Sequence, residues 1–184
     1  MKKLLLLALL SAAALPARAA ILQLDLQGSA RPFMSGLNEN PSNLSLGNGN
    51  EVGGGITYDD VLNLLTINVQ WFSLTGSVTA AHIHATASTG AAVFTTNGGV
   101  IFGIDGSTPG FSNAANGGGW TNTQVTLSGV QETQLLANQL YLNAHTSGNP
   151  GGEIRANLVQ AVPEPGSAAL LLAGCLGLLA RRRR

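Results

Sequence analysis

Alternation of apolar and polar residues at every second position is the feature that most constrains the fold. Leu22, Leu24 and Leu26 alternate with polar residues near the start of the chain. The same alternation recurs within residues 64–74, where the apolar positions are Leu65, Ile67, Val69 and Trp71. Side chains two residues apart project from the same face of a strand, so each run predicts a strand with one buried and one solvated face.

Further candidate strands are separated by segments rich in Gly, Asn, Ser and Thr, which favour turns. They cover residues 55–58, 78–85, 92–94, 100–104, 124–127, 140–144 and 153–159. Residues 131–138 form the one helical candidate, and residues 106–119, which hold few apolar side chains, are expected to form a long surface loop. Many short strands with polar turns predict an all-β fold, a Greek-key-like β-sandwich with one short helix.

The first 19 residues have the pattern of a secretory signal peptide. Lys2 and Lys3 form a basic start, residues 4–15 are an apolar run, and Ala17-Arg18-Ala19 is a small-x-small cleavage site. We expect export through the Sec translocon and cleavage after Ala19. The remaining body, residues 21–160, is one domain by length.

The last 23 residues, 162–184, also have a targeting pattern. Pro163-Glu164-Pro165 follows Val162, residues 167–180 are apolar, and four arginines occupy 181–184. A membrane helix of 14 residues is shorter than the roughly 17–25 that span a bilayer comfortably, and the arginines should stay cytoplasmic. An ordinary C-terminal membrane anchor is one interpretation of this pattern.

The tail also resembles the PEP-CTERM sorting signal of Gram-negative bacteria. That resemblance implies that exosortase, a membrane protease, reads the Pro163-Glu164-Pro165 motif. It also implies that the membrane helix is removed as the protein passes to the cell surface or extracellular matrix.

Charge and cysteine content exclude some functions for the body. Residues 21–160 carry eight acidic residues and two basic ones, Arg31 and Arg155, a net charge of −6. A body without lysine has no electrostatic footprint for nucleic acid or for an anionic membrane surface. It also has no cysteine, so no disulfide can stabilise it.

All three histidines of the chain lie on or at the end of two candidate strands. His82 and His84 are two residues apart and share a face, and His145 shares a face with Tyr141 and Asn143. If the two strands pair, three neutral imidazoles converge, a ligand set that suits one zinc or copper ion. The alternative is a surface or packing pair of histidines, with His145 hydrogen-bonded to a turn. No nucleophile with a base stands beside them in sequence, so we do not expect an enzyme.

These segments resemble the chordin-type (CHRD) domain, a β-rich module of animal chordins and many bacterial exported proteins. The resemblance runs from about Leu22 to Val159. It rests on Asn38-Glu39-Asn40-Pro41, Ala81-His82-Ile83-His84, Tyr141-Leu142-Asn143-Ala144-His145-Thr146 and Gly152-Glu153-Ile154-Arg155. Asn40 departs from the valine usual in the family. No reaction is generally assigned to the family. Glu153 and Arg155, two apart on one strand, are expected to form a salt bridge with each other or with a neighbouring strand.

A looser similarity to copper/zinc superoxide dismutases bears on mechanism. It implies copper ligation by His82, His84 and His145, with Arg155 near the position of the anion-guiding arginine. The bridging histidine and the disulfide cysteines are missing, so at most a single-metal site is implied. Our leading hypothesis is a non-enzymatic surface or matrix module that binds extracellular polysaccharide or protein. A zinc- or copper-binding module is the second hypothesis, and a dismutase-like redox enzyme is the third.

Overall fold

The computed structural model describes residues 20–104 and 106–161. Within these residues eleven strands pair in one continuous antiparallel sheet. The strands are β1 (Ile21–Gln27), β2 (Met34–Ser35), β3 (Asn48–Glu51), β4 (Ile56–Asp59), β5 (Leu64–Phe72), β6 (Val78–Ala85), β7 (Gly99–Gly103), β8 (Phe111–Ala114), β9 (Gly117–Thr126), β10 (Leu140–Thr146) and β11 (Ile154–Gln160). Helix α1 (Gly129–Leu136) and two 3₁₀ helices, η1 (Gly36–Asn38) and η2 (Gly90–Phe94), complete the described elements. The all-β prediction with one short α-helix is confirmed.

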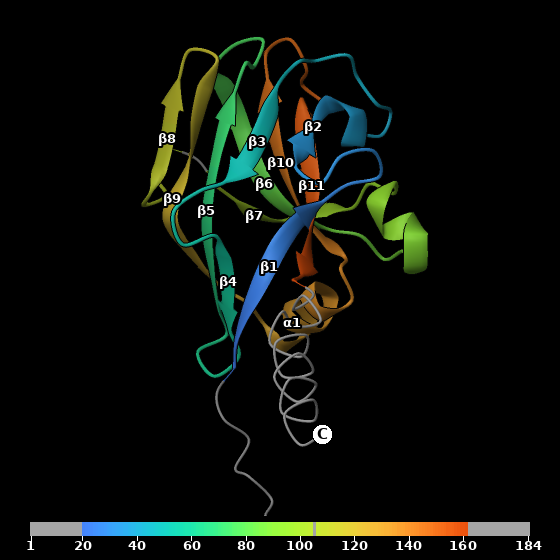
Figure 1. Cartoon of the computed structure of the whole chain (residues 1–184), viewed down its shortest axis with the longest axis vertical. Helices are drawn as coiled ribbons and strands as arrows, with labels where there is room; N and C mark the ends of the chain where they lie inside the picture. The colour runs from blue at the N-terminus through green and yellow to red at the C-terminus, as the bar shows by residue number, and fades with distance from the viewer. Residues whose placement is uncertain (1–19, 105, 162–184) are drawn as a thin grey trace, which may run out of the picture.

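The sheet folds over on itself into two packed layers (Figure 1). One layer runs β8-β9-β5 and continues into β4 and β3, and the other runs β7-β6-β10-β11 and continues into β1 and β2. Strand β1 joins the layers by pairing with both β4 and β11, and β2 joins them by pairing with β3 and β11. The result is a β-sandwich-like fold whose layers are continuous along one side.

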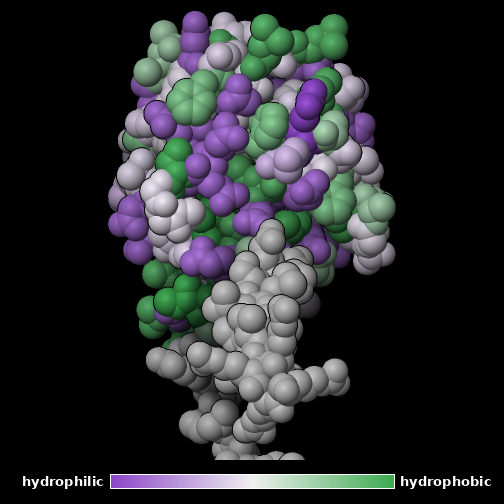
Figure 2. All heavy atoms as spheres, in the orientation of Figure 1, coloured by the Kyte–Doolittle hydropathy of each residue, from purple (hydrophilic) through white to green (hydrophobic). Residues whose placement is uncertain are grey.

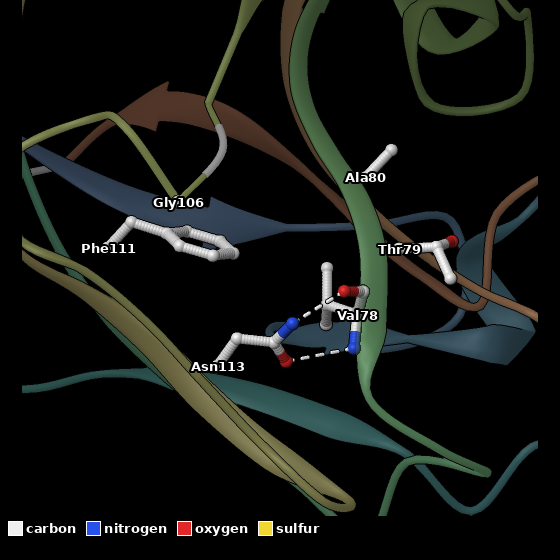
Figure 3. Close-up of a pocket in the computed structure, with 6 residues that line it drawn as sticks. All are labelled: Val78, Thr79, Ala80, Gly106, Phe111 and Asn113. Atoms are coloured by element: carbon white, nitrogen blue, oxygen red, sulfur yellow. Dashed lines mark hydrogen bonds between the residues drawn. The ribbon is translucent and has the colours of Figure 1, made fainter.

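The opposite side is connected by a side chain instead of a strand pair. The Oδ1 of Asn113 on β8 accepts from the Val78 amide of β6 at 3.0 Å, and its Nδ2 donates to the Val78 carbonyl at 2.6 Å (Figure 3). A carboxamide offers the same donor and acceptor as a backbone peptide group, so Asn113 takes the place of a ladder partner. A pocket of about 340 Å³ lies beside this contact, between Phe111 and the start of β6.

The core lies between the layers and is built from the alternating positions. Leu24 and Leu26 of β1 are buried, and the β5 run supplies four buried side chains, Leu65, Ile67, Val69 and Trp71. Trp71 meets Trp120 of β9 edge-to-face, with ring centroids 4.8 Å apart at an interplanar angle of 86°. Such aromatic pairs contribute about 0.5–1.5 kcal/mol beyond the area they bury. The predicted burial pattern of these two strands is confirmed.

Two local predictions are wrong. Residues 92–94, expected as a strand, lie in the 3₁₀ helix η2, because an apolar run this short does not distinguish strand from helical turn. The expected loop at residues 106–119 contains β8 and the first residues of β9. These two strands form a hairpin whose turn includes Asn116 at φ +62°, in the left-handed region that asparagine tolerates.

Helix α1 begins at Gly129, two residues before the predicted start at 131. Ser128 accepts a hydrogen bond from the amide of Gln131, and the Gln131 side chain accepts one from the amide of Ser128. This capping box satisfies two backbone donors that a helix start leaves without partners, and it fixes where the helix begins.

Strand β1 begins and β11 ends at the same end of the domain (Figure 1). Hydrophilic residues cover much of the face shown in Figure 2, and Val61 and Leu62, in the β4–β5 turn, are exposed. In residues 20–104 and 106–161 no helix is long and apolar enough to cross a membrane. The expected signal peptide (1–19) and sorting tail (162–184) lie outside the described residues.

Candidate metal centre

Pairing of β6 with β10 brings the three histidines onto one face of the sheet. His84 lies opposite Tyr141 in the antiparallel register, and His82 lies opposite Asn143, two residues before His145. The residues between them, including Ile83, Leu142 and Ala144, are buried in the core on the other face. Because side chains alternate along both strands, the burial of this apolar set fixes the histidines on the outer face.

The imidazole rings lie close enough to share one ion. The ring centroids of His82 and His145 are 4.8 Å apart, those of His82 and His84 5.3 Å, and those of His84 and His145 6.2 Å. One ligand nitrogen from each ring lies within 4.8 Å of the others. Two nitrogens bound to a tetrahedral zinc ion lie about 3.4 Å apart, given Zn–N bonds of about 2.0–2.1 Å. Small side-chain rotations therefore suffice to complete a three-histidine site.

Hydrogen bonds to backbone carbonyls determine which ring nitrogen of His84 and of His145 keeps a free lone pair. The Nδ1 of His84 lies 3.0 Å from the carbonyl oxygen of Gly98, and the Nδ1 of His145 lies 3.0 Å from that of Pro150. A carbonyl only accepts, so both Nδ1 atoms carry the proton and both Nε2 atoms present a lone pair. Metal-bound histidines have this same second hydrogen bond, which orients the ring and fixes its tautomer.

The two Nε2 atoms have different surroundings. That of His84 is buried and has no hydrogen-bond partner, whereas that of His145 lies 3.0 Å from Nδ1 of His82. His82 therefore donates its Nδ1 proton to His145. For His82 to bind metal through Nδ1, this proton would have to move to its Nε2; the residue as a whole is only partly buried. A buried polar atom without a partner is uncommon in folded proteins, so the Nε2 of His84 calls for an explanation.

Burial keeps the three rings in the neutral form that metals require. Desolvation lowers the pKa of His84 to about 4; the hydrogen bond to Gly98 raises it in part, and the charges of His82, His145 and Arg155 lower it further. Burial also lowers the pKa of His82 and of His145. All three are therefore neutral at pH 7, as metal binding through nitrogen demands.

Tyr141, on β10, packs against His84 of the neighbouring strand β6. The phenol ring stacks on the imidazole at a centroid distance of 4.8 Å and an angle of 7°. Its hydroxyl accepts from the Gly98 amide at 2.9 Å, so Tyr141 also holds the residue whose carbonyl fixes the His84 tautomer. The guanidinium of Arg155 lies on the same phenol ring, 3.7 Å from the centroid. His84, Tyr141 and Arg155 thus form one packed row across three strands.

Glu153 and Arg155 do not form a salt bridge with each other, so the first of the two pairings expected from the sequence is wrong. The Glu153 carboxylate, fully buried, accepts four hydrogen bonds instead: from Ser45 Oγ, Thr75 N, Thr75 Oγ1 and Thr146 Oγ1. Burial raises the pKa of Glu153, but these hydrogen bonds outweigh that effect and lower it overall. Glu153 is therefore an ionised anchor that joins two loops to the end of β10.

Arg155 is also fully buried, and it holds the segment around η2. Its guanidinium donates to the carbonyls of Val93 and Thr96 and to Oδ1 of Asn97, at 3.0–3.1 Å. A side chain with no exposed surface cannot guide an anion from solvent, so the role implied by the dismutase similarity does not apply here. Arg155 interacts electrostatically with Glu39: Arg155 lowers the pKa of Glu39, and Glu39 raises the pKa of Arg155, so each charge favours the other.

Some residues that shape the site carry no sequence signal. The carbonyls of Gly98 and Pro150 act through the backbone, which every residue type possesses. Asn38 belongs to a motif noted in the sequence, yet its role follows only from the fold. Its Nδ2 donates to the Arg155 carbonyl at 3.0 Å, and its Oδ1 accepts from the amides of Ala30 and Arg31. It thereby secures the loop after β1 to β11.

Comparisons with known proteins agree with this architecture. The model of the CHRD domain family matches residues 33–158, which include both histidine strands and β11. No curated protein and no solved structure matches the chain. The match spans well over half of the sequence, and the chain belongs to the CHRD domain family.

Proposed function

We propose that this CHRD domain is a non-enzymatic module that binds one zinc or copper ion through His82, His84 and His145. The observation that carries the proposal is the close grouping of three imidazoles, each with a ligand nitrogen within 4.8 Å of the others, together with the buried, unpartnered Nε2 of His84. Buried polar groups in a packing cluster are usually paired, so this nitrogen favours a ligand role.

The tautomers favour a ligand role over a surface pair. Two of the three rings direct Nδ1–H to backbone carbonyls, which leaves their Nε2 lone pairs directed into the cluster. Imidazole nitrogen suits zinc and copper better than calcium or magnesium, which prefer oxygen. His82 and His145 are only partly buried, so we expect water to fill a further coordination position of the bound ion.

Metal analysis of the purified body, residues 20–161, tests the proposal. We expect about one zinc or copper ion per chain after loading and desalting, and none in the His82→Ala/His84→Ala double variant. Gln124→Ala, which changes an exposed residue of β9, is the matched control and should keep its metal. Equal metal content in the double variant and the wild type would refute the assignment.

The terminal segments support a location for this module. We propose export through the Sec translocon, processing of the 162–184 tail by exosortase, and residence at the cell surface or in the extracellular matrix. Residues 20 and 161 are held at the domain's edge by hydrogen bonds to Asp60 and Gln23, so cutting the chain outside them leaves the core intact. Mass spectrometry of the protein from envelope and matrix fractions is the test. An uncut polypeptide in the cytosol would refute export and processing together.

A further inference from the structure

Glu39 is a buried acid that the metal site does not use. It is 8 % exposed and follows η1, and its Oε2 accepts from Nδ2 of Asn143 at 3.3 Å. Two oxygens of this pair, Oε1 of Glu39 and Oδ1 of Asn143, are buried without a hydrogen-bond partner. Buried polar atoms without partners are rare in folded proteins, so two of them in one contact require an explanation.

The two unpaired oxygens both lie beside Gly152. A Cβ atom placed on Gly152 would lie 2.8 Å from each of them. Gly152 therefore packs against the contact, and both oxygens are buried from solvent. Both atoms are acceptors when Glu39 is ionised, so in that state neither can satisfy the other.

We propose that the folded protein holds Glu39 as a neutral carboxylic acid in a reciprocal pair with Asn143, forming a latch that loosens when the acid ionises. In this pair the Oε1–H of Glu39 donates to Oδ1 of Asn143, while Nδ2 of Asn143 donates to Oε2 of Glu39. One proton gives both orphaned oxygens a partner.

The charged groups around Glu39 do not outweigh the effect of burial, which favours its neutral form. Burial raises the pKa of Glu39 to about 7, although Arg155 and the hydrogen bond from Asn143 each lower it in part. The other titratable group that senses Glu39 is Tyr141, whose pKa the Glu39 charge raises. His82 of β6 lies opposite Asn143 of β10 and stays neutral, because burial lowers its pKa. The terminal nitrogens of Arg155 donate to the segment around η2 and its Nε has no hydrogen-bond partner, so Arg155 does not form a close ion pair that would hold Glu39 ionised.

The latch controls how the segment after η1 closes over the sheet. This segment and the loop before β11 line a pocket of about 420 Å³, with Glu39 and Gly152 among the lining residues. Asn43 also bridges the two walls, since its Nδ2 donates to the Gly152 carbonyl at 3.1 Å. Loss of the proton from Glu39 removes the bond to Asn143 Oδ1 and leaves a buried charge, so these walls separate more readily above neutral pH.

The sign of the pH effect follows from the raised pKa. The unfolded chain ionises this acid near 4.5, so between about pH 5 and pH 7 the folded state binds more of its proton. Stability contributed by the latch is full below the unfolded pKa, falls as pH rises through this window and is lost above the folded pKa. Because unfolding releases this one proton within the window, the unfolding constant rises by up to about tenfold per pH unit.

Urea unfolding of the body between pH 5 and 9, in buffer with a metal chelator, tests the latch apart from any metal. Glu39→Gln reproduces the neutral acid, because its amide donates and accepts at the same positions. We expect the unfolding constant of the wild type, relative to Glu39→Gln, to rise by up to tenfold per unit from pH 5 to 7 and then level off. The three histidines are common to both proteins, so their opposite pH dependence cancels in the ratio. Asp25→Asn, an exposed acid on β1, is the control and should keep the wild-type profile.

Three results would overturn the proposal. The first is a pH-independent ratio between the unfolding constants of wild type and Glu39→Gln, and the second is a Glu39→Gln variant that fails to fold. The third is a carboxyl ¹³C resonance of Glu39 in the wild type, assigned by its loss in the variant, that titrates near pH 4.5 instead of near 7. Both readouts stand whether or not the histidines bind metal.

Discussion

Replacing Glu153 with glutamine should cost about 2–4 kcal/mol of folding free energy. The wild-type carboxylate is fully buried and accepts four hydrogen bonds at 2.5–2.8 Å. A hydrogen bond to a charged group contributes about 1.5–3 kcal/mol and a neutral one about 0.5–1.5 kcal/mol, so each bond weakens by about 1 kcal/mol. In the variant, the hydroxyls of Thr75 and Thr146 can rotate to accept from the new amide, which limits the loss.

Urea unfolding at pH 7 measures this loss, since a single domain of this size is expected to unfold in one transition. Asp25→Asn, which removes an exposed carboxylate on β1, should change stability by less than about 0.5 kcal/mol. Because the pKa of Glu153 is lowered in the fold, its contribution is present above the unfolded pKa of 4.5 and fades as pH falls through the folded pKa. The gap between wild type and Glu153→Gln should therefore narrow in acid. A gap at pH 7 no larger than that of Asp25→Asn would refute the role of Glu153 as an ionised anchor.

Three further outcomes are expected. Gly152→Ala should lose about 2 kcal/mol or more in urea unfolding, because Gly152 has φ +133° and a Cβ there would lie 2.7–2.8 Å from side-chain atoms of Asn143 and Glu39. Gly129→Ala, with open space at its Cβ, should be neutral or stabilising, and equal losses in the two variants would contradict the clash. Tyr141→Leu should weaken zinc binding about tenfold in calorimetry, because it removes the ring that stacks on His84. Tyr141→Phe keeps the stacked ring and should lose less affinity. Unchanged zinc affinity in the leucine variant would show that Tyr141 does not support His84. Zinc affinity should begin to fall only at a lower pH than for ordinary histidines of pKa 6.5, because burial lowers the pKa of all three ligands and takes that of His84 to about 4. A decline that begins near pH 7 in a pH series of titrations would contradict neutral, desolvated ligands.

Short-range pattern accounts for most of the strands and for the composition of the site. Alternation located β1, β5 and β6 well, since one buried face imposes period two on any strand. It failed at residues 92–94, where η2 is fixed by the Arg155 hydrogen bond to the Val93 carbonyl from a distant strand. It also failed at residues 106–119, because β8 is mostly exposed and has no apolar alternation to reveal it.

The histidine site shows the same division. The sequence indicated that His82 and His84 share a face and that His145 would join them if their strands paired. It could not supply the pairing itself, because β6 and β10 are more than fifty residues apart and their register depends on packing against the core. The expected partnership of Glu153 and Arg155 went wrong for a related reason: Glu153 precedes the first residue of β11, where the chain turns its carboxylate toward Ser45, Thr75 and Thr146.

By itself the sequence determined that this chain forms short amphipathic strands, lacks disulfides in its body and concentrates its imidazoles in two places. Those properties depend on neighbouring residues and on composition. Only the tertiary structure decided which strands pair, which ring nitrogens carry protons and which buried oxygens of Glu39 and Asn143 lack partners. Each of these is set by contacts between segments distant in the chain, whose energies exist only once the layers have packed.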